Sequence, residues 1–219
     1  MPFTPRTAGT LTTEVLARVR DPNGVMHTAA FVRARLSDAQ RCLNALLGFV
    51  VGNASINLNA LENFYVISTI TANAAIRLIG IRGSLTIRDL GRMPDLQSFL
   101  IYGATWPQHV TNQAIESWAT IGRDVLVLYP AITADIAIGM HYVKLTTTLS
   151  STSTLMEFSP DQDGLVVTLT EALLLLRQRD LGACQRALAR LHEALAPELV
   201  STPLSPALFG MTPTPEQQA

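Results

Sequence analysis

The residue types that most often carry catalysis or bind metals are scattered along this sequence of 219 residues. The four histidines, at positions 27, 109, 141 and 192, have no second histidine or cysteine at metal-ligand spacing. The sequence has no Gly-x-Ser-x-Gly elbow, and Gly80–Gly83 lacks the Lys-Ser/Thr ending of a phosphate loop. These patterns predict no enzyme, no metal site and no cofactor.

One acidic cluster, Asp161–Gly164, has the character of a cation loop. It resembles the beginning of a calcium loop but lacks the distal glutamate that completes one. Ser159 and Pro160 precede it, and both residue types favour the start of a helix, where acidic side chains are stabilised by the helix dipole. We therefore interpret the cluster as a helix start, with calcium binding as the alternative.

Fifteen of the basic residues are arginines, and Lys144 is the single lysine. Those in predicted helices that could contact phosphate are Arg33, Arg35, Arg41, Arg177, Arg179, Arg186 and Arg190. They alternate with acidic residues, which favours solvated or ion-paired helix faces, and contact with DNA is the alternative. The net charge of −1 gives no overall electrostatic case for nucleic-acid binding.

The cysteines and tryptophans are expected to be structural. Cys42 and Cys184 both fall in predicted helices, and two such residues make neither a disulfide framework nor a metal site. We expect buried, reduced thiols. Trp106 and Trp118 flank a polar stretch, where sheet packing is expected and ligand stacking is the alternative.

The strongest helical signal is a predicted hairpin over 159–196. Its first helix is apolar on nearly every side, so Leu173 is predicted to be buried. Asp180 follows a polar break and can cap the second helix. The apolar positions of that helix are Leu181, Cys184, Leu188, Leu191 and Leu195.

The remaining elements follow from periodicity. Helices are predicted at 10–20 and 28–50, after an N-terminal arm at 1–9. Alternation predicts strands at 64–67, 75–82, 85–90, 114–120, 125–129 and 136–145, with a short helix within 92–102 and a loop at 146–154. This order predicts an α+β fold in which a helical bundle, formed by 10–50 and 160–196, carries an inserted antiparallel β-rich domain at 62–146.

Composition points to assembly. The chain is 48% hydrophobic and only 15% charged, which favours a surface covered by partners, with a well-packed monomer as the alternative. No signal core and no membrane-spanning run is present, so synthesis and assembly in the cytosol are expected. Residues 197–219 hold five prolines and are predicted to form an extended tail. Its apolar residues, which include Leu204, Leu208, Phe209 and Met211, are expected to contact a partner, and a strap folded back on the same subunit is the alternative.

Several runs, in order, give the chain a resemblance to the head-to-tail adaptor (connector) proteins of tailed bacteriophages, especially the short-tailed kind. The runs are Glu14–Asp21, Leu36–Arg41, Gly122–Ala131, Ile136–Lys144 and Asp163–Leu195. They are similar to the family's first helix, its second helix, a strand ending in proline, the next strand and the closing helical pair. Residues 157–160 replace an acidic Leu-Pro segment of the family.

The resemblance implies a structural virion protein at the head-tail junction, assembled in the host cytoplasm. It implies a homo-oligomeric ring, usually twelve-fold, that docks beneath the portal protein, joins it to a tail or nozzle protein and contacts DNA non-specifically in its channel. It implies no catalysis and no membrane. Another phage neck or tail protein, or a small-ligand-binding α+β domain, is the alternative.

Overall fold

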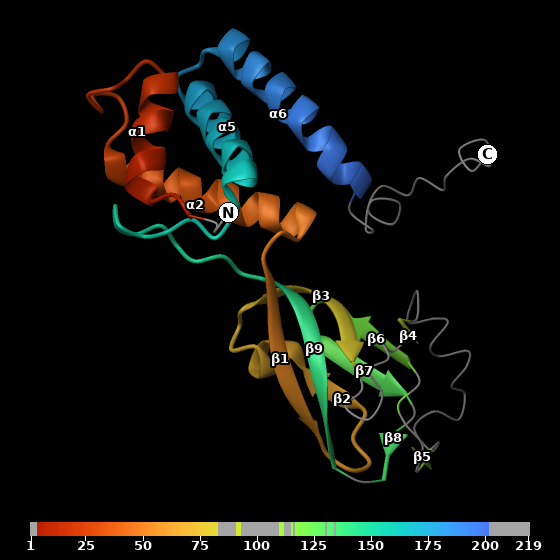
Figure 1. Ribbon diagram of the computed structural model, residues 1–219. Helices are drawn as coiled ribbons and strands as arrows, with labels where there is room; N and C mark the ends of the chain where they lie inside the picture. Colours follow the sequence, from red (N-terminus) through yellow and green to blue (C-terminus); the bar gives the residue numbers. More distant parts are fainter. Residues whose placement is uncertain are drawn as a thin grey trace, which may run out of the picture. The chain divides into compact units, whose positions relative to one another are not determined.

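A computed structural model of the chain contains two compact units (Figure 1). The structure describes residues 4–82, 91–92, 110–111, 115, 117–129, 131–133 and 135–201. The helical unit comprises Met1–Phe49 and Thr146–Ala219, and the strand unit comprises Val50–Leu145. The fold is therefore mixed α+β, which confirms the predicted class.

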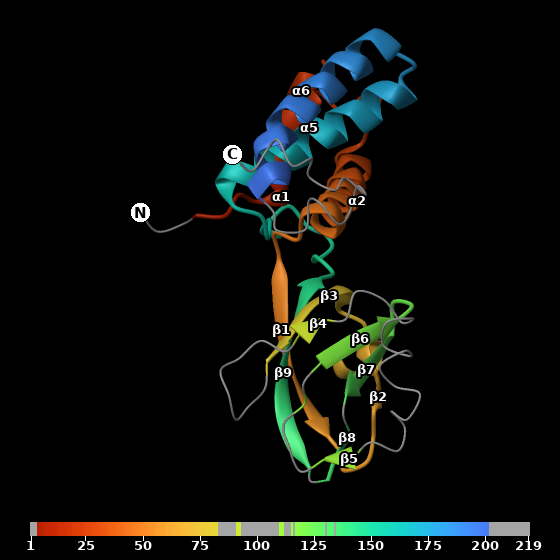
Figure 2. The same ribbon diagram turned by 90° about the vertical axis from the view of Figure 1, so that its right-hand side faces the viewer.

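Four long helices build the described part of the helical unit: α1 (Ala8–Arg18), α2 (Ala29–Leu47), α5 (Pro160–Arg177) and α6 (Leu181–Ser201). Helix α5 contacts the other three, and α1 also contacts α2 (Figures 1 and 2). Thr7 and Thr28 cap α1 and α2, because their hydroxyls accept hydrogen bonds from backbone N–H groups in the first turn. None of the described helices combines the length and hydropathy of a membrane span.

The loop predicted at 146–154 is irregular, and together with residues 155–159 it is part of the helical core. Leu149, Met156 and Phe158 are buried, and the ring of Phe158 packs edge-on against Phe49 at 5.3 Å. The backbone of the segment also bonds to the start of α1, with Ala8 N donating to Thr154 O at 2.8 Å. Tertiary contacts thus order a stretch that lacks local periodicity.

The prediction that Leu173 is buried is wrong, since 37% of its surface is exposed. The buried stripe of α5 consists of residues at helical spacing, namely Asp163, Val166, Val167, Thr170, Glu171 and Leu174. Two carboxylates and a threonine occupy this stripe because partners bond to them. Leu173 and Leu176 consequently lie on the outer side of α5.

Helix α6 differs from its prediction at two points. Its inner positions include Cys184, Ala187 and Leu191, whereas Leu188 is exposed. The helix also contains Pro197 and ends at Ser201, so the predicted tail begins later than residue 197. Pro197 lacks the N–H that would bond to the carbonyl of Glu193, and its ring crowds that carbonyl, so it weakens the last turn of α6.

Two sheets form most of the described strand unit. The first has the antiparallel order β1 (Val51–Leu58), β9 (Ile136–Lys144), β3 (Ala75–Arg82). The second has the order β2 (Phe64–Val66), β7 (Val125–Tyr129), β6 (Ser117–Ile121), β4 (Gly91–Arg92), in which only the β4–β6 pair is parallel. A further parallel pair joins β5 (Val110–Thr111) to β8 (Ala131–Ile132), and a short helix α3 (Ile67–Ile70) follows β2.

The core of the strand unit lies between the two sheets (Figure 2). It contains Trp118 from β6, Leu126 from β7, Met140 from β9 and Tyr65 from β2. Trp118 is almost completely buried, so its predicted packing role in the sheet is confirmed. Trp106 lies outside the described residues.

Most strand predictions match in position, with three differences. Residue 67 begins α3 instead of ending a strand, and the strand predicted at 114–120 is observed as β6, at 117–121. Strand β1 was not predicted, because small residues such as Gly52 and Ala54 give it a weak apolar alternation. The predicted strand 85–90 and the predicted helix within 92–102 lie largely outside the described residues.

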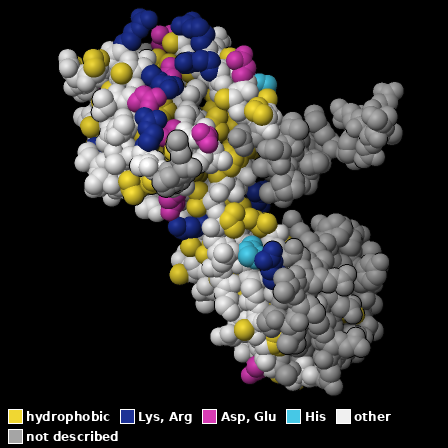
Figure 3. Space-filling model, viewed as in Figure 1, with side chains coloured by type: hydrophobic (Ala, Val, Ile, Leu, Met, Phe, Trp, Pro, Cys, Tyr) yellow, Lys and Arg dark blue, Asp and Glu magenta, His cyan; other side chains and the backbone are white. Residues whose placement is uncertain are grey.

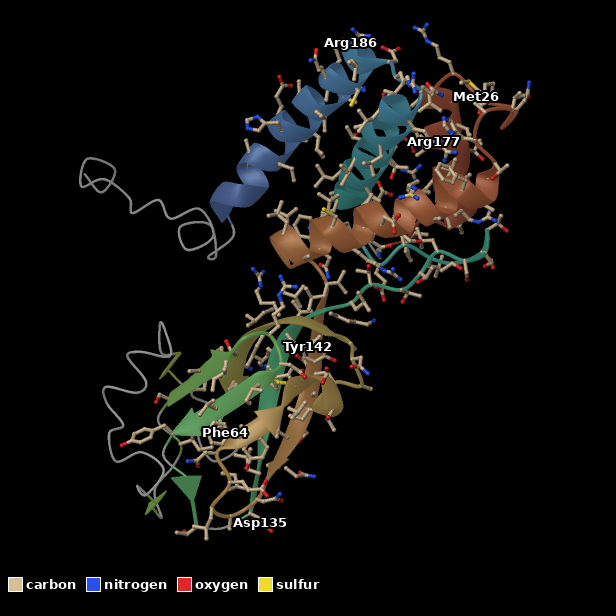
Figure 4. All side chains as sticks on the ribbon, turned by 180° about the vertical axis from the view of Figure 1, so that it is seen from behind. Met26, Phe64, Asp135, Tyr142, Arg177 and Arg186 are labelled. Atoms are coloured by element: carbon tan, nitrogen blue, oxygen red, sulfur yellow. The ribbon has the colours of Figure 1, made fainter. Side chains whose placement is uncertain are left out.

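Gly52 permits a close cross-strand contact. It pairs with Tyr142 across β1 and β9, and a Cβ atom at position 52 would lie only 2.6 Å from the Tyr142 ring. Tyr142 is itself buried in the core (Figure 4). The aromatic ring therefore occupies the space that a side chain at position 52 would need.

Gly52→Ala is expected to destabilise the strand unit by about 2 kcal/mol, because the added methyl group must displace the Tyr142 ring. Both tryptophans of the chain belong to this unit, so urea unfolding followed by tryptophan fluorescence measures the change. Gly80→Ala is the matched control, since a Cβ there meets no atom within 4 Å. Equal effects of the two substitutions would contradict the packing account.

Candidate functional site

Six alternating charges form one ion-pair network across the helical unit. It runs through Asp163, Arg6, Glu14, Arg18, Glu171 and Arg190. Arg190 lies 2.7 Å from Glu171, and Arg18 lies 2.5 Å from Glu14. The network joins the N-terminal arm, α1, α5 and α6.

The two acids contributed by α5 are the most buried members of the network. Asp163 and Glu171 are 2% and 5% exposed, whereas their arginine partners reach solvent. A buried carboxylate without a cation is costly, so α5 can occupy its place only while the arm, α1 and α6 supply arginines. The ion pairs therefore couple the positions of these elements.

The protonation behaviour of the network differs from site to site. Burial would raise the pKa of Glu14, but hydrogen bonds from Arg6 and Arg18 outweigh it and hold this pKa below its ordinary value of 4.5. Burial raises the pKa of Asp163, and the charge of Arg6 offsets only part of that effect. The hydrogen bond to Glu14 raises the pKa of Arg6 above its ordinary value.

A groove of about 780 Å³ lies beside this network, between the end of α1, the end of α5 and α6. We call it the arginine groove, and its charged lining residues are Arg18, Arg20, Arg186, Arg190, Glu171 and Asp180. Arginine side chains gather on this part of the helical unit in the space-filling view (Figure 3). Arg18 and Arg190 are paired with Glu171, but the guanidinium groups of Arg20 and Arg186 have no hydrogen-bond or ion-pair partner among the described residues.

The apolar part of the groove includes Met26, which a rigid loop presents to solvent. The carboxylate of Asp21 accepts backbone hydrogen bonds from Val25, Met26 and His27 at 2.8–2.9 Å. Burial alone would raise the pKa of Asp21, but these bonds hold it below its ordinary value. Val25 and Met26 nevertheless remain strongly exposed, and an ordered loop with apolar residues at its tip favours contact with a partner.

An exposed apolar surface continues from this loop onto α2 and α5. We call it the Phe31 surface, and its members are Met26, Phe31, Leu173, Leu176 and Arg177. Buried His27 stacks on Phe31 at 6.0 Å between ring centroids, and the Arg177 guanidinium lies over the same ring at 4.2 Å. Met26 and Arg177 lie at the same end of the helical unit (Figure 4). The surface is therefore apolar at its centre and cationic at its edge.

The strand unit carries a turn of opposite charge. Residues 59–62 follow β1, and at their tip Leu61 is 66% exposed with a φ of 66°. Asp135 accepts a hydrogen bond from Ala60 N at 2.8 Å, and Glu62 accepts one from the side chain of Asn59 at 2.8 Å. We call this the acidic turn (Figure 4 labels Asp135). Burial raises the pKa of the neighbouring Tyr65 hydroxyl, and the charges of Glu62 and Asp135 raise it further.

The predicted partner-contact residues Leu204, Leu208, Phe209 and Met211 lie outside the described residues. The structure separates the predicted arginines into different roles. Arg190 pairs with Glu171, Arg35 pairs with Asp38, and Arg177 lies on Phe31. Both cysteines are free, and Cys184 is buried as predicted, but the prediction is wrong for Cys42, which lies on the exposed side of α2.

Sequence analysis missed the contributions of Arg6, Arg20 and Met26. Pro22, Asn23 and Gly24 predict only a turn after the first helix, although two large apolar residues, Val25 and Met26, directly after such a turn are unusual. That composition is the one signal that marks the loop. Nothing local marks Arg6, whose partner Asp163 is 157 positions away.

Comparison with known proteins identifies no family, since no family model and no curated protein matches the chain. The function must therefore be argued from the surfaces described above.

Glu171→Ala is expected to cost about 2 kcal/mol of stability in the helical unit, because it leaves Arg18 and Arg190 without their shared buried partner. Urea unfolding followed by far-ultraviolet circular dichroism measures this loss. Asp38→Ala is the control, because it breaks an exposed pair with Arg35 and should cost well under about 1 kcal/mol. A loss at Glu171 no larger than the control would refute the coupling role of the network.

Glu14→Gln is expected to flatten the pH dependence of stability. The folded-state pKa of Glu14 is lowered, so its contribution is fully present above the ordinary value of 4.5 and is lost as the pH falls through the folded value. Unfolding midpoints of wild type and variant, measured from pH 7 to about 3, should therefore converge on acidification. Asp163 has a raised pKa and the opposite slope, but it is common to both proteins. A constant difference between them would contradict the assignment.

Proposed function

We propose that this protein is a structural subunit of the head-to-tail adaptor ring of a tailed bacteriophage. In this role it self-associates into a ring, docks beneath the portal protein, binds a tail or nozzle protein and surrounds DNA without sequence-specific contact. The protein acts by binding and not by catalysis. Its place is the head-tail junction of the virion, after assembly in the host cytoplasm.

The observation that carries the proposal is the exposed Phe31 surface. Soluble monomers rarely expose contiguous large apolar side chains on ordered elements, and such patches mark sites of protein association. Here the patch is built on two packed helices and on a loop held by Asp21, so it is present before any partner binds. The guanidinium groups of Arg35 and Arg177 at its edge add contact area and can orient a partner through their charge.

The strand unit offers a second exposed apolar surface. Phe64 and Val66 lie on the same side of edge strand β2 and are about half exposed. Two separate apolar surfaces on one chain suit a subunit that contacts more than one neighbour. The adaptor assignment in particular rests on the resemblance in the order of the sequence runs, and the tail residues Leu208 and Phe209 remain its proposed contacts with the portal or the adjacent subunit.

Another phage neck or tail component would use the same surfaces, and binding to purified portal protein distinguishes the two. A small-ligand-binding role is favoured by one observation, the volume of the arginine groove, which lies in the range of ligand pockets. The groove is rimmed by arginines, whereas such pockets are mostly apolar, so we place this role second.

Leu173→Asp/Leu176→Asp is expected to leave the helical unit folded but to abolish assembly, because both side chains lie outside the core. Circular dichroism measures folding, and analytical ultracentrifugation with and without purified portal protein measures association. Leu155→Asp is a control at an equally exposed leucine away from the Phe31 surface. Val167→Asp buries an unpaired carboxylate and should unfold the unit.

The adaptor proposal fails if the wild-type protein neither self-associates nor binds portal protein. If the double variant assembles as the wild type does, the Phe31 surface is not the assembly contact.

A further inference from the structure

The arginine groove has an arrangement that calls for a specific kind of ligand. Its unpaired guanidinium groups, Arg20 and Arg186, come from different segments, the turn after α1 and the first turns of α6. Apolar side chains, including Met26 and Leu175, line the space together with them. A complementary ligand therefore carries negative charges on both sides of an apolar group.

The paired residues of the groove keep these free charges in place. Glu171 is buried and pairs with Arg190 at 2.7 Å and with Arg18 at 3.6 Å. The charges of these two guanidinium groups are therefore already balanced within the helical unit. The carboxylate of Asp180 accepts a hydrogen bond from Ala183 N at the start of α6, and no ion pair among the described residues joins it to Arg186. Arg20 and Arg186 thus remain available.

The acidic turn of the strand unit has the complementary arrangement. Leu61 is exposed in the same turn as two carboxylates: Glu62 follows it directly and accepts a hydrogen bond from Asn59, and Asp135 accepts one from Ala60 N. The hydroxyl of Tyr65 bonds to the backbone of Asn59 and Glu62, which holds the turn in shape. The turn is a rigid apolar knob flanked by two negative charges.

We propose that the acidic turn of one copy of the protein inserts into the arginine groove of a neighbouring copy. In this contact Leu61 packs against the apolar lining, and Glu62 and Asp135 pair with Arg20 and Arg186. The proposal rests on the proposed self-assembly and names the residues that make it directional.

A second copy fits this groove better than nucleic acid does. A phosphate backbone supplies negative charge but no apolar group to cover Met26 and Leu175. Charge complementarity and the apolar lining together favour a protein knob.

The contact joins two different surfaces, so it is heterologous. A heterologous contact repeats from subunit to subunit and closes into a ring if the rotation permits, whereas an isologous contact stops at a dimer. A groove of this size is too small to hold a stable assembly alone, so it determines direction and register, and the Phe31 surface supplies additional buried area.

The test uses two variants of the full chain. The groove variant is Arg20→Glu/Arg186→Glu, and the turn variant is Leu61→Gly/Glu62→Gln, which offers the reversed groove no new cation. Glycine suits the positive φ at position 61, and Asp135 keeps its bond to Ala60, so the turn should stay folded. The control, Arg123→Glu/Arg179→Glu, makes the same change in net charge at two exposed arginines that do not line the groove.

Sedimentation of wild type, with and without portal protein, sets the reference assembly. Each variant alone should associate at least about tenfold more weakly than wild type, and the control should match wild type. An equimolar mixture of the two variants retains one intact groove and one intact turn, so it should form dimers and no larger species.

Normal assembly of the groove variant overturns this inference and leaves the adaptor proposal standing. Higher assemblies in the mixture would also overturn it, because one intact contact cannot propagate. If the groove variant assembles normally but loses binding to a double-stranded DNA oligonucleotide, the groove serves nucleic acid instead. Wild-type protein that remains monomeric with and without portal protein overturns the contact between copies. If it also fails to bind portal protein, the adaptor function is overturned as well.

Discussion

Two buried carboxylates on one helix impose the main constraint on the helical unit. Asp163 and Glu171 lie on the inner stripe of α5, where an unpaired charge would be prohibitive. Their partners come from the arm before α1, from α1 and from α6, so one ion-pair network ties together elements that lie far apart in sequence. Such a network adds less stability than an apolar core of equal volume, but it accepts only one arrangement of its helices.

The network also determines which groups stay available to partners. Glu171 engages Arg190 and Arg18, whereas Arg20 and Arg186 remain unpaired within the described part of the chain. Because polar residues occupy positions on the buried stripe, leucines such as Leu173 and Leu176 are displaced to the outside of α5. The interior arrangement of α5 therefore produces both the arginine groove and the Phe31 surface.

The strand unit has a hydrophobic core of its own. Its two sheets enclose an aromatic and aliphatic core around Trp118, and Gly52 leaves room for the ring of Tyr142. The acidic turn at residues 59–62 is held by hydrogen bonds to Tyr65 and Asp135, so Leu61 is exposed by a rigid frame. Both units thus display apolar side chains on ordered backbone, which is the basis of the proposed assembly role.

The sequence by itself determined the fold class, the helix starts at Thr28 and Ser159, and the strands with clear alternation, because capping and periodicity are local properties. It placed the start of the first helix at residue 10, whereas α1 begins at Ala8, after its cap Thr7. It did not determine burial on α5. Apolar periodicity predicts that Leu173 is buried, yet Leu173 is exposed and Glu171, two positions earlier, is buried. Only tertiary structure brings Arg18 and Arg190 to Glu171, and a buried charge is tolerated when partners from other elements compensate its desolvation. Pairing between distant residues leaves no periodic trace in the chain.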